Sequence, residues 1–224
     1  MGEKLTLTAE DGHKFSAYRA TPAGAPRGAL VVIQEIFGVN HHIRNVTDGF
    51  ARDGYVAIAP ALFDRVEPDY ETGYEQADVE RGRNVRQKLG WDSMIMDVRA
   101  AVKEAAKTGL KVGVVGYCMG GTLAWLAGTR IDGVSAAVGY YGGGIADTAS
   151  ERPKCPVMLH FGETDASIPP EHWKTVRAAQ PTLPVFVYAG AGHGFSCDER
   201  ASFHRPSHEQ ARERTTEFFQ KHVG

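Results

Sequence analysis

The pentapeptide at positions 116–120, Gly-Tyr-Cys-Met-Gly, has residue types and spacing that could perform covalent chemistry. A nucleophile with a glycine two positions away on each side is typical of a sharp turn between a strand and a helix. The apolar run 111–115 fits such a strand, and 121–128 has the composition of a close-packed helix. Cys118 would then lie at a helix N-terminus, where the helix dipole favours a thiolate. We therefore expect acyl transfer through Cys118; the alternative is a buried cysteine that serves only as a small apolar residue.

A cysteine nucleophile needs a base, and the base needs an acid that orients it. Two downstream strands end in such residues: Asp165 follows the apolar run 156–161, and His193, between two glycines, follows the run 184–188. The order nucleophile, acid, histidine is that of the α/β-hydrolases. Because parallel strands place their carboxyl ends at one edge of a sheet, the three side chains are expected to converge there.

Alternatives for these partners remain open. Asp165 could instead cap the helix that begins near position 169, and Glu163 is a second acid two residues away. Neither the histidine pair at 41–42 nor the pair at 204 and 208 has a convincing metal-ligand arrangement. We expect no metal site and no cofactor.

Composition limits the class of protein. The 224 residues are 42% hydrophobic and 23% charged, with a formal net charge of −2, which predicts one domain over 1–224 and no nucleic-acid partner. No apolar run approaches the length of a membrane span, so no membrane partner and a cytoplasmic location are expected. The three cysteines are odd in number and widely spaced, which argues against a disulfide framework and for a reducing compartment.

The pattern of apolar runs predicts the fold class. Residues 4–20 alternate around a turn and indicate an N-terminal antiparallel hairpin. A polar stretch at 64–90 contains a helix near 74–88 and is interpreted as a lid. We expect a mostly parallel sheet with helices on both faces, as in the α/β-hydrolase fold. The predicted strands are 29–33, 55–59, 111–115, 134–139, 156–161 and 184–188, and the predicted helices are 42–52, 91–107, 119–129, 170–179 and 206–222.

A further motif, Gln-Glu-Ile-Phe-Gly at 34–38, follows the first of these strands. Together with the cysteine elbow it makes the chain resemble the dienelactone hydrolase (carboxymethylenebutenolidase) family. The resemblance covers nearly the full length and includes Gly-Tyr-Tyr-Gly at 139–142, Ala-Gly-His at 191–193 and Arg-Thr at 214–215 of the last helix. It implies a hydrolase that opens an enol-lactone or a related activated ester through a Cys118 acyl-enzyme, without metal or cofactor.

The resemblance also implies roles for individual residues. In that family the resting cysteine is a neutral thiol, and the glutamate that matches Glu35 takes its proton when substrate arrives. His193, oriented by Asp165, would be the second proton shuttle. Independently, a carboxylate directly after an apolar strand would be partly desolvated, which suits a base. The alternative is that Glu35 is a salt-bridged loop residue.

Two further features of the site follow from the resemblance. The backbone N–H groups of Ile36 and Met119 would form the oxyanion hole, which stabilises the negative charge of the tetrahedral intermediate. Tyr141 matches a tyrosine of the family's pocket and is a candidate for contact with substrate.

The family binds the substrate carboxylate with two arginines. The first, on the lid, matches Arg81, with Arg83 as a neighbouring alternative. The second belongs four residues after the catalytic histidine, where this chain has Cys197. Arg200 or Arg205, from the following loop, would have to supply the missing charge, and surface roles for these arginines are the alternative.

Other functions compete with this hypothesis. A broader carboxylesterase or thioesterase is the main alternative among enzymes. The chain could also bind a small ligand without turnover, or Cys118 could be a redox-sensing thiol with Cys197 as its resolving partner. We expect a small-molecule substrate as partner, and a monomer because no surplus amphipathic helix is apparent.

Overall fold

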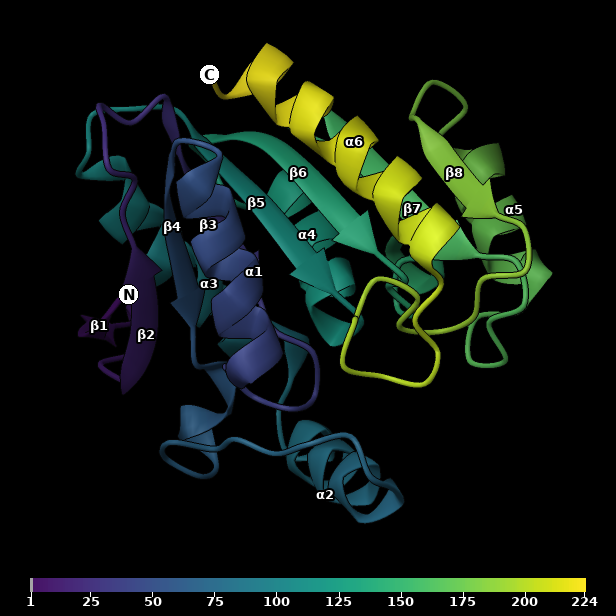
Figure 1. The fold of residues 1–224 in the computed structure, drawn as a ribbon, viewed down its shortest axis with the longest axis horizontal. Helices are drawn as coiled ribbons and strands as arrows, with labels where there is room; N and C mark the ends of the chain where they lie inside the picture. The colour runs from purple at the N-terminus through teal and green to yellow at the C-terminus, as the bar shows by residue number, and fades with distance from the viewer. Residues whose placement is uncertain (1) are drawn as a thin grey trace.

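An eight-stranded sheet forms the centre of the protein, in the order β1-β2-β4-β3-β5-β6-β7-β8 (Figure 1). The structure is a computed structural model and describes residues 2–224. The strands are β1 (Glu3–Thr8), β2 (Lys14–Ala20), β3 (Gly28–Ile33), β4 (Tyr55–Pro60), β5 (Val112–Tyr117), β6 (Val134–Tyr140), β7 (Val157–Gly162) and β8 (Val185–Tyr188).

Strand pairing confirms the predicted topology. The hairpin of β1 and β2 is antiparallel, with Leu5 opposite Ala17, and β2 also pairs antiparallel with β4. All other neighbouring strands are parallel. The carboxyl ends of β3 to β8 therefore lie at one edge, where the candidate residues were expected.

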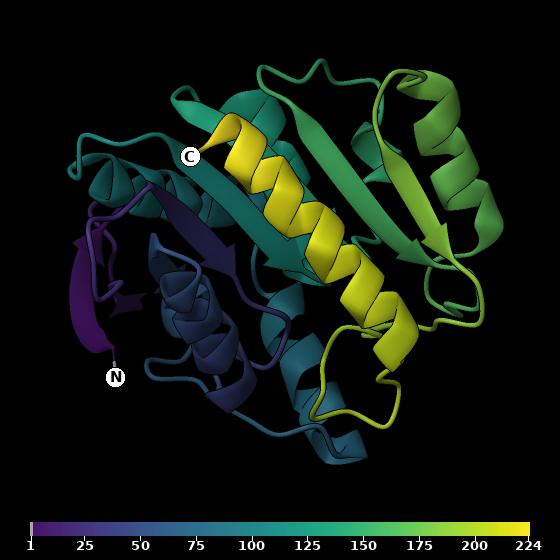
Figure 2. The ribbon, with the colours of Figure 1, turned by 45° about the horizontal axis from the view of Figure 1, so that its top comes forward.

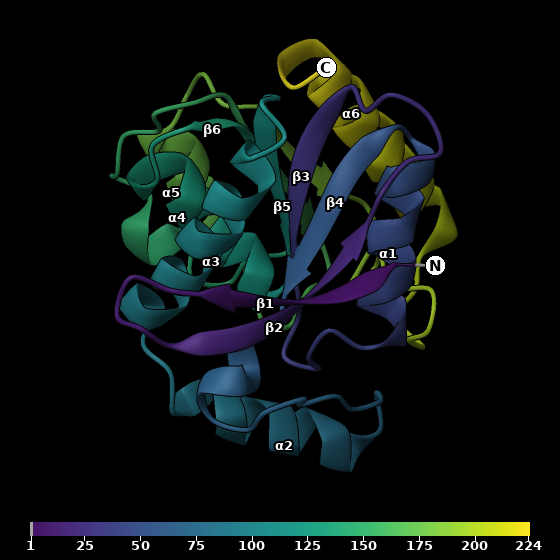
Figure 3. The same cartoon turned by 90° about the vertical axis from the view of Figure 1, so that its left-hand side faces the viewer.

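Helices cover both faces of the sheet, as Figure 3 shows in side view. One face carries α1 and α6, and the other carries α3, α4 and α5. Among residues 2–224, no helix is long and apolar enough to span a bilayer. The helices are α1 (His41–Arg52), α2 (Gln76–Gln87), α3 (Trp91–Ala106), α4 (Met119–Arg130), α5 (Pro170–Ala179) and α6 (Arg205–His222), with short 3₁₀ turns at Leu62–Arg65 and Ala146–Thr148.

The core is concentrated on the central strands and α4. Every residue of β3, β4 and β5 is buried, as expected for parallel strands covered on both faces. In α4 all residues except the last are buried, and Trp125 donates a 3.0 Å hydrogen bond to Thr148. On the opposite face α6 packs along β6 and β7 (Figure 2), and Tyr140 donates to the carbonyl of Ala211 at 3.0 Å. These contacts hold in place the strands and the helix α4 that position the turn at Cys118.

The segment interpreted as a lid forms α2, which lies beyond the carboxyl ends of the strands (Figure 1). A reciprocal capping box of Glu75 and Asp78 begins this helix. Gly82 brings it close to the loop after β3, because a Cβ there would lie 2.4 Å from the carbonyl oxygen of Ile36. One side of α2 therefore faces the expected site.

Candidate active site

The cysteine elbow is strained and closely packed. Cys118 has φ 56° and ψ −119°, a conformation that is rare for a residue with a side chain, and it immediately precedes α4. The turn requires glycine at both flanking positions. A Cβ on Gly116 would lie 1.9 Å from the carbonyl oxygen of Gly120, and one on Gly120 would lie 2.4 Å from that of Ile33. Strain held in this way is characteristic of functional turns and projects the thiol beyond the sheet.

Three side chains from the ends of three strands meet at this turn. His193 Nε2 lies 3.1 Å from the Cys118 sulfur, and His193 Nδ1 lies 2.7 Å from Asp165 Oδ2. Asp165 is buried, whereas His193 and Cys118 are partly exposed. The structure thus brings together the nucleophile, acid and histidine selected by their order in the sequence.

The rival acid lies elsewhere. Glu163 is exposed and accepts a hydrogen bond from the backbone N–H of Gly190 at 3.2 Å. The other oxygen of Asp165 accepts from the N–H of Ser167 at 2.8 Å, while Pro169 is the residue that caps α5. Asp165 is therefore held by its own loop with one oxygen left for His193.

The surroundings of His193 favour its protonated form. Burial alone would lower its pKa, but the negative charge of the Cys118 sulfur and the hydrogen bonds to Asp165 and Cys118 outweigh burial and raise the pKa to about 10. A protonated imidazole in this position could donate its proton to a group bound next to the Cys118 sulfur.

Glu35 is buried and pairs with an arginine. Its side chain is 1% exposed, and Oε1 lies 3.2 Å from Nη1 of Arg200. Within residues 2–224, no hydrogen bond joins Glu35 to Cys118, and Oε2 has no hydrogen-bond partner. The guanidinium of Arg200 also lies against the ring of Phe37, 5.3 Å from its centre. In this structure the Cys118 thiol therefore pairs with His193. Glu35 forms a salt bridge with Arg200, which was the alternative to a direct role as a base.

A cavity of about 340 Å³ opens beside the thiol. Its wall is apolar where Phe37, Trp91 and Ile168 contribute, and it includes both Cys118 and His193. Among the described residues that line it there are three arginines and no carboxylate. These are Arg83, Arg86 and Arg200. The cavity can therefore accommodate a small ligand that carries negative charge.

The two residues expected to form the oxyanion hole also line this cavity. Met119 is the first residue of α4, where a backbone N–H has no carbonyl partner within the helix. Ile36 lies across the cavity wall in the loop after β3. This placement is compatible with the predicted role, which stays a prediction.

Arg81 does not reach the cavity. It pairs with Glu67, and its guanidinium lies 5.0 Å from the centre of the Tyr70 ring. Arg83 and Arg86 line the cavity instead. The difference comes from helix geometry, because Arg81 lies on another side of α2.

A signal for these arginines was present in the sequence. Val79, Arg83 and Arg86 are spaced i, i+4, i+7, which places them on one side of a helix. Arg86 is partly buried; it lies 3.9 Å from the centre of the Trp91 ring and donates to the carbonyl of Leu89 at 2.6 Å. Arg83 is more exposed and freer to meet a ligand.

Tyr141 packs against His193 outside the cavity wall. It is fully buried, its ring centre is 5.2 Å from that of His193, and it is not among the residues that line the cavity. Its backbone N–H donates to the carbonyl of His160 at 2.7 Å. In this structure the tyrosine supports His193 by packing.

Cys197 differs from a reactive thiol. It is fully buried, and burial together with the nearby negative charge of Glu35 raises its pKa to about 12. Since the thiolate is the reactive form, such a cysteine is a poor partner for thiol exchange. All three cysteines are free, and the redox alternative gains no support.

The remaining candidate arginine, Arg205, is exposed at the start of α6 and lies 3.8 Å from Glu209 of the same helix. Arg200 is thus the residue of the loop after His193 that brings positive charge to the cavity.

Comparison with known proteins identifies the family. The sequence profile of the dienelactone hydrolase family matches residues 15–223. The carboxymethylenebutenolidase of Pseudomonas putida is 34% identical over 229 residues, which cover 96% of this chain and 95% of the relative. A Klebsiella pneumoniae crystal structure assigned to the dienelactone hydrolases superposes with a TM-score of 0.84 at 29% identity, covering 98% of this chain and all of that one.

A more distant structure shares only the fold. The dienelactone hydrolase-like phosphotriesterase P91 from metagenomic libraries has a TM-score of 0.75 at 19% identity, covering 100% of this chain and 99% of that one.

The full-length matches confirm the predicted α/β-hydrolase fold and a hydrolase that acts on ester or lactone bonds. The chain belongs to the dienelactone hydrolase family.

Proposed function

We propose that this protein hydrolyses a small enol-lactone that carries a carboxylate, through a thioester on Cys118. The observation that carries the proposal is the 3.1 Å contact between Cys118 and His193 beside a cavity with three arginines. The contact supports a nucleophilic thiolate, and the arginines support an anionic substrate.

In the first half of the reaction the Cys118 sulfur attacks the lactone carbonyl carbon. The N–H groups of Ile36 and Met119 stabilise the oxyanion of the tetrahedral intermediate, and such a donor typically lowers the barrier by about 3–4 kcal/mol. The ring C–O bond then breaks, the carbonyl reforms as a thioester, and the electron pair leaves on an enolate. That stabilised leaving group takes up one proton, supplied by His193, and becomes a ketone.

In the second half water attacks the thioester. His193, now neutral and still oriented by Asp165, accepts the proton of the water, and the carbon–sulfur bond breaks. The products are the restored thiolate, the protonated His193 and a carboxylic acid that releases its proton to solvent as a second carboxylate, and one water is consumed per turnover. When Cys118 carries its proton in the resting protein, Glu35 accepts that proton once substrate draws Arg200 away from it, and the thiolate then attacks.

Arg200, Arg83 and Arg86 are proposed to bind the substrate carboxylate. A guanidinium offers two parallel N–H donors to a carboxylate, which fixes both the position and the orientation of the ligand. Arg200 replaces the arginine absent from position 197, and α2 contributes the other two from the opposite wall.

The test compares dienelactone with p-nitrophenyl acetate, followed by absorbance, for the wild type, Cys118→Ala and Cys155→Ala. Cys155 is the matched control because its thiol is partly buried and lies 3.8 Å from the carbonyl of Gly128 in α4, outside the residues that line the cavity. We expect lactone turnover in the wild type and Cys155→Ala, and none in Cys118→Ala. Rapid quenching and mass spectrometry should detect the acyl group on Cys118.

Turnover of the acetate ester alone would assign the protein to uncharged activated esters, as for the broader esterase alternative. Inactivity on both substrates, or lactone turnover that survives Cys118→Ala, would contradict the proposal.

A further inference from the structure

Behind the cavity, three potential metal ligands meet from three parts of the chain. Glu35 follows β3, His42 lies in the first turn of α1, and Cys197 lies in the loop before α6. They are 1%, 2% and 0% exposed, and one ligand atom of each lies within 4.8 Å of the other two. A buried carboxylate, imidazole and thiol this close together are an unusual combination for a core.

Two of these ligand atoms lack a partner. Within residues 2–224, Glu35 Oε2 and His42 Nε2 are both buried and make no hydrogen bond. A buried polar atom without a hydrogen-bond partner destabilises the folded state. Two unpartnered polar atoms on side chains that cluster with one thiol indicate a binding site for a ligand.

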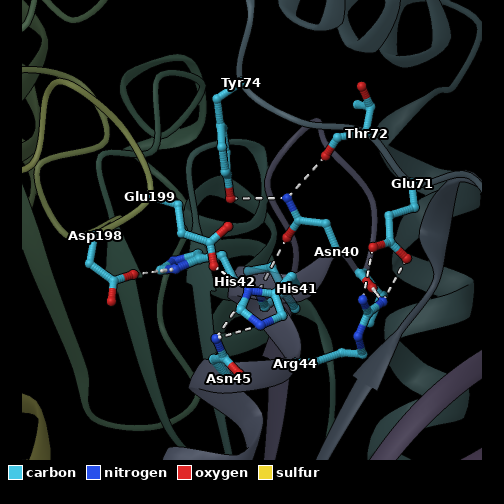
Figure 4. Close-up of polar contacts among 12 residues, drawn as sticks. Asn40, His41, His42, Arg44, Asn45, Glu71, Thr72, Tyr74, Asp198 and Glu199 are labelled. Atoms are coloured by element: carbon cyan, nitrogen blue, oxygen red, sulfur yellow. Dashed lines mark hydrogen bonds and ion pairs between the residues drawn. The ribbon is translucent and has the colours of Figure 1, made fainter.

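A carboxylate fixes the orientation of His42. Nδ1 of the ring lies 3.0 Å from Asp198 Oδ1, as Figure 4 shows. Because an ionised carboxylate only accepts, this contact places a proton on Nδ1, and in that tautomer the buried Nε2 keeps a lone pair without a hydrogen-bond partner. Metal-binding histidines are commonly oriented in this way by a carboxylate on the second nitrogen.

Glu35 is also arranged to serve two partners. Oε1 contacts Arg200 at 3.2 Å, which leaves Oε2 for the cluster. Sulfur, imidazole nitrogen and a single carboxylate oxygen suit zinc, whereas calcium and magnesium prefer oxygen ligands alone. From these contacts we propose that Glu35, His42 and Cys197 bind a divalent transition metal ion of the zinc type.

Dimensions and charge are compatible with this ion. Ligand atoms around tetrahedral zinc are roughly 3–4 Å apart, so small side-chain shifts suffice from the observed spacing of at most 4.8 Å. The Cys197 thiolate and the Glu35 carboxylate would balance the charge of the ion, and three protein ligands leave its fourth position for water. The thiol proton would be released on binding.

One member of the cluster also lines a hollow on the surface. His42 and Asp198 line a hollow of about 330 Å³, and Asp198 and Glu199 form a second group of potential ligands with His42. Figure 4 shows both carboxylates next to the two histidines that begin α1. These acidic groups would attract a cation and pass it to the buried side of His42.

Metal binding would have a consequence that rests on the proposed function. Glu35 held by both the ion and Arg200 could neither accept a proton from Cys118 nor release Arg200 to the substrate. The ion would therefore act as an inhibitor of lactone hydrolysis, and the cluster would be a regulatory site.

The test uses Co²⁺ as a coloured substitute for zinc, because a thiolate ligand gives cobalt a charge-transfer band in the near ultraviolet. The full chain is freed of metal by a chelator and titrated as the Cys118→Ser variant, so that Cys118 cannot supply a thiolate band. We expect one equivalent of Co²⁺ with a thiolate band. Cys197→Ser added to this background should abolish the band, whereas Cys155→Ser should leave it unchanged.

A second variant keeps the test valid if Cys197→Ser disturbs the core. Asp198 is 68% exposed, so Asp198→Asn should fold, and loss of its support for His42 should weaken Co²⁺ binding by about 10–100-fold. No thiolate band in the Cys118→Ser protein, or a band that survives Cys197→Ser, would overturn the metal site. Zn²⁺ inhibition of wild-type lactone hydrolysis is measured separately, so that a protein inactive on lactones but able to bind cobalt would contradict only the proposed function.

Discussion

Arg200 holds the buried Glu35 in an ion pair of 3.2 Å, although 165 positions separate them in the sequence. The same guanidinium forms part of the cavity wall. One cation therefore faces both the internal carboxylate and the place where an anionic substrate would bind, so that the two compete for it.

Arg200→Gln tests this competition. We expect kcat/KM for dienelactone to fall by about 10–100-fold, because a hydrogen bond to a charged group contributes about 1.5–3 kcal/mol. Hydrolysis of p-nitrophenyl acetate, which has no carboxylate, should fall much less. Arg205→Gln is the matched control, since Arg205 is exposed and contacts Glu209. Equal losses on both substrates would show that Arg200 acts on Glu35 or the fold instead of the carboxylate.

The side of α2 that faces the cavity gives a second prediction. Arg83→Gln should raise KM for dienelactone by about fivefold, since a partly exposed ion pair contributes about 1 kcal/mol. Arg81→Gln, two positions away, should leave KM unchanged because that side chain pairs with Glu67. Steady-state kinetics gives the KM of each variant. A larger rise in KM for Arg81→Gln than for Arg83→Gln would indicate that Arg81 binds the substrate carboxylate instead.

These arginines show where reasoning from the sequence stopped. The strand and helix positions followed from apolar periodicity, and α5 spans Pro170–Ala179 as predicted because proline marks its first turn. The order of Cys118, Asp165 and His193 could be read because parallel strands deliver their ends to one edge. Local chemistry and a simple topology rule were enough for these features.

The positions of long side chains and the paths of loops could not be predicted from the sequence in the same way. The position of the Arg200 guanidinium depends on how the loop after His193 folds back over Phe37, which no local pattern encodes. Arg81 was selected by its position relative to the start of the next helix, whereas helix periodicity decides which arginines face the cavity. His42 joins Glu35 and Cys197 only through tertiary packing, so a histidine pair at a helix start gave no sign of this cluster.

Titration of His193 tests the thiolate pair. Its pKa is raised to about 10, and the charge of Cys118 is the largest cause that raises it. Cys118→Ala should therefore lower the pKa of the His193 ring, which NMR of labelled histidine measures directly. A raised pKa means that folding favours the protonated ring, so this stabilisation is complete below about pH 6.5 and is lost as the pH rises through about 10. An unchanged pKa in the variant would show that Asp165 alone holds the proton.

The pair of Arg65 and Asp97 provides a prediction for stability. Arg65 donates two hydrogen bonds of 2.7 Å to Asp97, whose side chain is 0% exposed. Arg65→Ala should lower the free energy of unfolding by about 3–5 kcal/mol because it leaves a buried carboxylate without its partner. Arg99→Ala, which removes a partly exposed pair with Glu10, should cost less than about 1 kcal/mol. Urea denaturation of both variants measures the two free energies of unfolding. Similar losses of stability in the two variants would contradict the larger contribution assigned to the Arg65–Asp97 pair.

The distribution of the catalytic groups also bears on how the protein folds. Cys118 and His193 are 75 positions apart, and β8, the four-residue strand before His193, pairs only with β7 at the edge of the sheet. Contacts between residues so distant in sequence form late, because the loop between them must first be closed. The Cys118–His193 contact therefore forms only when the last edge strand has docked. Recovery of thiol reactivity during refolding should lag behind recovery of helical circular dichroism, which makes the nucleophile a built-in reporter of the final folding step.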